Sequence, residues 1–316
     1  FLSIGSKETG IVLFPVLMIL LYQKENKINL EIIKKYFKEI SAIIIGIGFY
    51  FFLRFFSLGI TSFLNVKTSL IENPLLYTDT LSRIATSFKI LWMYFYKTFW
   101  PVNLCSDYSY NQIPVIHNLF NLQTILGLLI MAVSVFFMFK YLKNKKILAL
   151  GSGIFLFSFL PVSNMFFPTG TIAGERLFFF PSLGISIIFA LVVYTILISI
   201  EKKKSQIILL IFITLLLGTY GILSLKRESV WLTEKSLFIS GAECAPNSVL
   251  SRSNLGAMYL INGNLDKAEE ELKISMEMKP IYSKGINNLG LVYFRKGEYE
   301  KAKEMYYLAL KQDFPY

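Results

Sequence analysis

The sequence predicts an all-α protein in which membrane-spanning helices are followed by a stack of short paired helices. Of its 316 residues, 54% are hydrophobic and 17% are charged, whereas about a quarter of a soluble domain is charged. Long apolar runs fill residues 1–225, while residues 226–316 are rich in Lys, Glu and Asn and carry a 34-residue period. We therefore expect a polytopic helical bundle over the first range and an α-solenoid over the second.

Six apolar segments approach the roughly 20 residues that a bilayer-spanning helix needs. They cover residues 9–22, 40–58, 120–139, 147–165, 181–200 and 206–225. A seventh segment, 84–100, is interrupted by Lys89 and Lys97. These two lysines lie eight residues apart and so on nearly one face of a helix. We expect this segment to be an interfacial helix rather than a span.

Lysine-rich loops set the predicted orientation, because cytoplasmic loops of membrane proteins are enriched in Lys and Arg. Lysines gather after the first, third and fifth spans: Lys24, Lys27, Lys34, Lys35 and Lys38; Lys140, Lys143, Lys145 and Lys146; Lys202, Lys203 and Lys204. Six spans place all three loops inside. The stretches 59–119 and 163–180 then share the outer face with the repeats. That face is the periplasm for a bacterial inner membrane, which the abundant Ile, Lys, Asn and Phe favour, or the lumen for an ER membrane.

The charge and the cysteine count exclude several classes of function. A net charge of +11 could attract nucleic acid, but the basic residues cluster in short loops between apolar runs, as in membrane proteins. Cys105 and Cys244 show no CxxC spacing, and His117 is the single histidine. We therefore expect no metal-thiolate site and no Cys/His catalysis. Whether the two cysteines pair, and whether a divalent metal is required, the sequence leaves open.

Two sets of residues recur 34 positions apart in the C-terminal part. The first set is Leu255, Gly256, Tyr259, Gly263, Ala268 and Pro280, and the second is Leu289, Gly290, Tyr293, Gly297 and Ala302. This pattern resembles tetratricopeptide (TPR) repeats, with small residues where paired helices touch. We expect about two and a half units, with more repeats beyond Tyr316. The concave surface of the stacked repeats is expected to hold an acceptor protein or peptide.

Charged and aromatic residues on the predicted outer face could bind a phosphate at the height of the lipid head groups. The candidate cations are Lys7, Arg54, Lys97 and Arg176, the supporting polar residues are Glu8, Tyr108, Tyr110, Asn164 and Glu175, and the candidate base is Asp107. Each has a plainer interpretation. Lysines and arginines near span ends also anchor helices by snorkelling, and tyrosines are common at membrane interfaces. A Glu-Arg pair also serves as a structural ion pair.

Several of these stretches, taken in order, resemble the transmembrane-and-TPR family of protein O-mannosyltransferases and its bacterial relatives, membrane glycosyltransferases of the GT-C type. They are Ser6-Lys7-Glu8, Leu53-Arg54, Asn73-Pro74, Asp107-Tyr108-Ser109-Tyr110 with Ile113-Pro114, Pro161-Val162-Ser163-Asn164, Glu175-Arg176 with Pro181-Ser182, Arg227, Trp231, Leu237-Phe238, Ser240-Gly241 and Pro246-Asn247.

The resemblance implies transfer of a mannose-like sugar from a polyprenyl-phosphate carrier to a protein hydroxyl outside the cytoplasm. The chemistry needs cations for the leaving phosphate and a carboxylate to deprotonate the acceptor. Lys7 and Arg176 are the expected cations. The family's catalytic acid lies in an early outer loop that this chain lacks, so we expect an N-terminally truncated fragment that is inactive alone, with Asp107 in a structural or acceptor-site role.

Two other classes of function remain possible from the sequence. The first is a non-catalytic membrane scaffold that recruits partners through its repeats, with the polar loops serving only packing. The second is a transporter, which would place charges within the spans and show internal repeats in the bundle. The predicted spans are nearly without charge, which disfavours a transporter.

Overall fold

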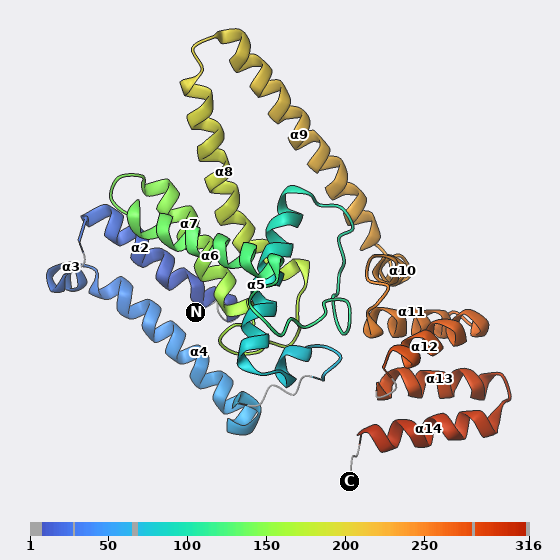
Figure 1. Ribbon diagram of the computed structural model, residues 1–316. Helices are drawn as coiled ribbons and strands as arrows, with labels where there is room; N and C mark the ends of the chain where they lie inside the picture. Colours follow the sequence, from blue (N-terminus) through green and yellow to red (C-terminus); the bar gives the residue numbers. More distant parts are fainter. Residues whose placement is uncertain (1–7, 28, 65–68, 280–281, 314–316) are drawn as a thin grey trace.

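The computed structural model describes residues 8–27, 29–64, 69–279 and 282–313, and every regular element in these ranges is a helix (Figure 1). The all-α prediction is therefore confirmed. Lys7 and Pro280 lie outside the described residues, and so does the side chain of Glu8.

The helices follow one another along the chain in three groups. The first group is η1 (Glu8–Val12), α2 (Leu13–Glu25), α3 (Leu30–Lys35), α4 (Phe37–Leu64), η2 (Pro74–Tyr77) and α5 (Thr80–Phe99). The second is α6 (Leu122–Lys140), α7 (Lys146–Phe159), η3 (Leu160–Val162), η4 (Glu175–Phe178), α8 (Phe179–Ser199) and α9 (Lys203–Val230). The third is α10 (Glu234–Cys244), α11 (Val249–Ile261), α12 (Leu265–Met278), α13 (Ser283–Arg295) and α14 (Tyr299–Asp313).

Four helical segments of the described chain, rather than the predicted six, are long and apolar enough to cross a bilayer. They are Phe37–Ser57, Leu122–Lys140, Glu175–Ser199 and Lys203–Val230. The expected span at 9–22 is a short 3-10 turn followed by α2, whose 13 residues reach only about 20 Å. The expected span at 147–165 is α7 with 14 residues, eight of them buried. Burial inside a helical bundle produces the same apolar pattern as a membrane, and length separates the two.

Helix α7 is the centre of the bundle, packed against α2, α6 and α8. Its closest approach is to α8, where a Cβ on Gly184 would lie 2.4 Å from the carbonyl oxygen of Gly151. On the other side of the bundle, a Cβ on Gly127 of α6 would collide with the backbone of Phe88 on α5. Glycines thus let backbones touch, which is how helices associate where lipid supplies no hydrophobic force.

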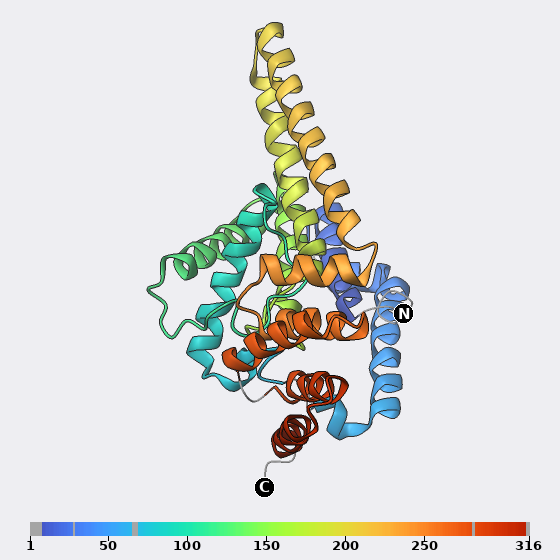
Figure 2. The same cartoon turned by 90° about the vertical axis from the view of Figure 1, so that its right-hand side faces the viewer.

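Two loops that the sequence places on the cytoplasmic side lie at one end of the bundle. The Gln23 side chain donates to the Lys146 carbonyl at 2.8 Å, and the Lys146 ammonium donates back to the Gln23 carbonyl. These bonds join the end of α2 to the start of α7. Helices α8 and α9 form a V whose arms diverge from their short connection (Figure 1) and overlap in the view of Figure 2. Helix α4 runs along the outside of the molecule in both views, with no buried residue in its apolar segment.

Helices α10 to α14 form a stack of antiparallel neighbours beside the bundle (Figure 1). Gly263 and Gly297, 34 residues apart, have φ of +76° and +80° in the turns within each helical pair, a conformation that favours glycine. Helix α9 runs to Val230, through the boundary predicted at residue 225, so the polypeptide passes from bundle to repeats within one helix.

The predicted TPR residues lie at the contacts between paired helices. Ala268 and Ala302 are buried, as are Leu255 and Leu289. Gly256 faces Leu272 across its pair, where a Cβ would come within 2.6 Å of the Leu272 side chain. The remaining members behave similarly: Gly290 meets Tyr306 and Met305, Tyr293 is buried, and Tyr259 packs partly buried at the edge of the core.

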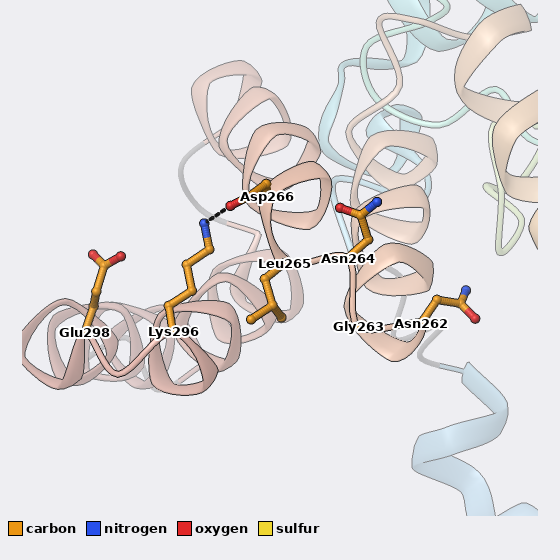
Figure 3. A pocket seen from close by; sticks show the side chains of 7 residues that line it. All are labelled: Asn262, Gly263, Asn264, Leu265, Asp266, Lys296 and Glu298. Carbon is orange, nitrogen blue, oxygen red and sulfur yellow. Dashed lines mark hydrogen bonds and ion pairs between the residues drawn. The ribbon is translucent and has the colours of Figure 1, made fainter.

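One ion-pair network joins the two repeat pairs. The Lys296 ammonium reaches Asp266 and Glu269 of α12 at 2.6 Å each, and Figure 3 shows it extending toward Asp266 beside an open surface hollow. Glu269 also pairs with Lys273 of its own helix at 2.6 Å. The hydrogen bonds from Lys273 and then Lys296 lower the pKa of Glu269 to about 2. The hollow is therefore lined by charges that are already paired within the repeats.

Candidate functional site

The outer loops meet around the buried phenol of Tyr94 on α5. Its hydroxyl donates to the Gly174 carbonyl at 2.9 Å and accepts from the Gly174 amide at 2.8 Å. The Tyr94 ring stacks on Phe178 with centroids 4.7 Å apart. These contacts fix the turn that carries Glu175 and Arg176 against α5.

A buried pair of asparagines holds the loop that precedes this turn. Asn164 has φ of +61°, a conformation that asparagine tolerates well. Its amide nitrogen donates to the carbonyls of Thr171 and Ile172 at 3.2 and 3.1 Å. Its oxygen accepts from Asn73 at 2.9 Å and from the Thr169 amide. Asn164, predicted as a supporting polar residue, is thus the centre of a fully bonded loop.

We expect Asn164→Asp to destabilise the protein by about 2–3 kcal/mol, because a carboxylate oxygen would replace the donor that faces two carbonyl oxygens in a buried site. The two side chains have nearly the same shape, so packing changes little. Thermal unfolding of the protein in detergent measures the loss. Asn118→Asp is the control, since exposed Asn118 only accepts a bond from the Phe120 amide. Equal stability of the two variants would contradict the role of Asn164.

Glu175 lies between a tyrosine and an arginine that come from distant parts of the chain. One carboxylate oxygen accepts from the Tyr108 hydroxyl at 3.3 Å, and the other pairs with Arg227 of α9 at 3.5 Å. Arg227 and Glu175 are 17% and 24% exposed. Tyr108 in turn accepts a bond from the Cys105 amide at 3.2 Å. The expected structural ion pair of Glu175 therefore exists, but with Arg227 rather than with the adjacent Arg176.

Lys97 approaches the same cluster from the end of α5. Its ammonium donates to the Asn103 carbonyl at 2.8 Å and lies 5.7 Å from the centre of the Tyr108 ring. Burial lowers the pKa of Lys97, Glu175 opposes this and Arg227 adds to it. Lys89, on the same face of α5, donates to the Pro114 carbonyl. The two lysines that interrupt the apolar segment thus both hold the following loop.

Arg176, the residue after Glu175, lines an apolar pocket. The pocket, of about 180 Å³, lies among η1, α2, α7 and the start of α8. Ser158 and Arg176 contribute polar side chains to its lining. The other lining residues are Gly10, Val12, Leu13, Val16, Ile154, Val162, Leu177, Phe180 and Leu183. Arg176 is exposed. A guanidinium beside an apolar cavity matches an amphiphile with an anionic head.

Asp107 and Tyr110 lie where the outer loop meets the repeats. Asp107 accepts from the Ser109 amide at 2.9 Å and from the Ser248 hydroxyl at 3.4 Å. The Tyr110 carbonyl accepts from the Val249 amide at 2.7 Å, and its ring lies 5.2 Å from the Lys279 ammonium. Both side chains therefore serve the junction between the loop and the first repeat helices.

Cys105 and Cys244 form a disulfide with a Cα–Cα distance of 5.7 Å, within the usual range. It joins the loop after α5 to the end of α10, across 139 residues. The sequence offered no spacing signal for this pair, since the two cysteines become neighbours only when α10 folds back onto the loop.

The structure brings Lys97, Tyr108 and Glu175 together. Arg176 directly follows Glu175 in the chain. Arg54 is not part of this group: it donates to Tyr50 on its own helix, α4, at 2.7 Å. Three residues that the prediction of the site left out are central to it, namely Tyr94, Asn73 and Arg227. Arg227 and Asn73 were visible only as members of the family pattern. Within the described ranges, no group of three or more His, Cys, Asp or Glu side chains is placed to hold a metal.

Two family descriptions match parts of the chain. The domain described as Protein O-mannosyl-transferase TMTC, DUF1736, matches residues 66–135, and the tetratricopeptide repeat matches residues 283–315. The resemblance to the TMTC family is confirmed. The TMTC match includes Asn73, Lys97, Asp107, Tyr108 and Tyr110, and the repeat match covers α13 and α14. The chain is therefore an integral membrane protein that carries TPR repeats.

Curated proteins named protein O-mannosyl-transferase are similar to parts of this chain. A protein O-mannosyl-transferase of Caenorhabditis elegans is 27% identical over 89% of the chain and 38% of its own length. Protein O-mannosyl-transferase TMTC1 of Mus musculus is 26% identical over 69% of the chain and 24% of its length. Tmtc2 of Drosophila melanogaster is 32% identical over 39% of the chain and 13% of its length. The chain thus spans less than two fifths of these relatives. No solved structure matches it.

Proposed function

We propose that this chain is part of a membrane glycosyltransferase that moves a mannose-like sugar from a polyprenyl-phosphate carrier to a protein hydroxyl. The observation that carries the proposal is Arg176, held at an apolar pocket beside the turn that Tyr94 and Glu175 fix. A polyprenyl phosphate combines a hydrocarbon chain with an anionic head, and this pocket offers a partner for each. The names of the TMTC relatives support the reaction.

The donor phosphate becomes a leaving group during transfer, so negative charge develops on it. A positioned guanidinium stabilises such developing charge. Arg176 takes this role in the proposal, with Lys7 as the second cation from sequence. Lys97, bonded to loop carbonyls, contributes positive potential and holds the loop rather than contacting phosphate.

Asp107, the candidate base from the sequence, already accepts two bonds at the junction with the repeats, which favours a structural role near the acceptor over deprotonation of the acceptor. The repeats, residues 226–316 in this proposal, hold the acceptor protein or peptide on their concave surface.

The outer loops and the repeats are proposed to face the periplasm, or the ER lumen in a eukaryote. Two contacts support one shared face: the Asn111 amide donates to the Asn247 carbonyl at 2.9 Å, and the Ile172 amide donates to the Glu72 carbonyl at 3.2 Å. A disulfide between the loop and α10 suits an oxidising compartment.

The test is sugar transfer by the full-length protein in liposomes. Mannose-labelled polyprenyl phosphate is supplied with a Ser/Thr-rich peptide, and labelled peptide is counted. We expect transfer that depends on the lipid-linked donor and is not replaced by a nucleotide sugar. Absence of transfer with intact peptide binding to the repeats would overturn the proposal and favour the membrane-anchored TPR scaffold instead.

A further inference from the structure

Helix α10, the first helix beside the repeats, is fastened at two points one turn apart, once to α9 and once to the loop after α5. Ser240 accepts a bond from Arg227 of α9 at 3.3 Å, and Cys244 forms the disulfide with Cys105. Residues four apart lie on one face of a helix, so a single face of α10 carries both links. Those links reach the same carboxylate by different routes.

The two routes close a ring around Glu175. From Cys105, the chain of contacts continues through its amide to the Tyr108 hydroxyl and from there to one Glu175 oxygen. From Ser240, it continues through Arg227 to the other Glu175 oxygen. Both oxygens of this carboxylate are therefore held by groups that α10 secures. Arg227 also stacks over Trp231, with 5.9 Å between guanidinium and ring centre, which orients it from the α9 side.

The Glu175 side chain matters because it is the polar anchor next to Arg176, in a turn whose two ends are held at Gly174 and Phe178. The short helix η4 begins at Gly174 without a side-chain cap, and Gly174 itself is held by Tyr94. Arg176, the next residue, is exposed and lines the pocket. If Glu175 loses its partners, Tyr94 still holds the turn against α5 at Gly174. The contact that fixes the orientation of residues 175 and 176 is then lost.

We infer that α10 and the oxidised Cys105–Cys244 pair, acting through Arg227 and Tyr108, position Arg176 at the proposed donor pocket. Arg227 is a positioning residue in this arrangement, because it touches Glu175 and not the pocket. The inference rests on the proposed function for the role of Arg176, but the mechanical link itself does not.

The link also fixes where the repeats stand. Ser109 and Ser248 share a buried hydrogen bond of 2.7 Å, and the Tyr110 carbonyl accepts from the Val249 amide. Together with the ring around Glu175, these bonds hold the start of the repeats at a constant position relative to the turn. An acceptor bound to the repeats is presented at a set distance from the donor, rather than by a swinging arm.

The experiment measures amide hydrogen exchange of residues 174–178 in the full-length protein in liposomes, together with transfer kinetics. We expect Arg227→Gln, and separately the double variant Cys105→Ser with Cys244→Ser, to raise exchange in this turn about tenfold. The KM for the lipid donor should rise severalfold, with peptide binding to the repeats unchanged. Arg227→Lys, which keeps the charge, should restore part of the protection.

The control is Arg252→Gln, which breaks a comparable Arg–Glu pair, 2.9 Å to Glu271, inside the repeats. It should leave exchange at 174–178 unchanged. Unaltered exchange in Arg227→Gln and in the cysteine variant, or an equal rise in Arg252→Gln, would overturn the inference. If wild-type protein transfers no sugar while these exchange differences appear, the proposed function fails and the positioning link stands.

Discussion

Replacing Arg176 by alanine is expected to lower sugar transfer by about 10²–10³-fold, the loss typical when one preorganised charge-stabilising donor is removed. The exposed guanidinium lines an apolar pocket, so it can contact the phosphate while the hydrocarbon chain of the donor lies in the pocket. Because the phosphate gains charge as the sugar leaves, most of the loss should fall on kcat rather than on the KM for the donor. Transfer of labelled mannose from polyprenyl phosphate to peptide measures it.

Two further variants sharpen this prediction. Arg176→Lys keeps the charge but not the planar fork that binds phosphate through two bonds, so it should recover only part of the activity. Lys202→Ala removes an exposed cation at the opposite end of α8 and should transfer at the wild-type rate. Undiminished transfer by Arg176→Ala would remove this residue from the donor site.

Gly184→Leu is expected to destabilise the bundle by more than about 3 kcal/mol, at the upper end of the cost of overpacking. A Cβ at this position would lie 2.4 Å from the Gly151 carbonyl oxygen and 2.5 Å from the Phe155 amide nitrogen. Both atoms belong to the α7 backbone, which no rotamer change can move aside. Helices α7 and α8 would have to separate, and with them the walls of the Arg176 pocket.

Gly218→Leu is the matched control for this substitution. Gly218 lies in α9, another apolar helix, and nothing lies within 4 Å of its built Cβ. We expect it to fold with wild-type stability or slightly above, since leucine favours helix more than glycine does. Unfolding temperatures in detergent compare the two. Similar unfolding temperatures for Gly184→Leu and Gly218→Leu would contradict the close α7–α8 contact.

The helical repeats were the most predictable part of the molecule. Gly263 and Gly297 mark turns with positive φ, and Ala268 and Ala302 mark helix contacts, in the register that the 34-residue period predicts. Each unit packs mainly against its neighbours in sequence, so local pattern and structure coincide. The same holds for Lys89 and Lys97, whose spacing placed them on one face of α5.

The number of helices long enough to span a membrane was less predictable, because the apolar segment at 147–165 forms the 14-residue helix α7. Its neighbours α2, α6 and α8 bury it, and a buried helix and a lipid-facing helix have the same composition. Likewise, Asp107 and Tyr108 are adjacent in the sequence, yet Asp107 bonds Ser248 while Tyr108 bonds Glu175.

By itself, the sequence determined the all-helical class, the membrane character, the repeats and the set of polar residues from which the site is drawn. These properties follow from composition and short-range periodicity. Only the tertiary structure decided that Glu175 pairs with Arg227, that Cys105 meets Cys244, and that Arg176 lines the apolar pocket while Arg54 stays on the outer helix α4. Such partners lie 52 and 139 residues apart, and how α9 and α10 return to the outer loops depends on packing across the whole bundle.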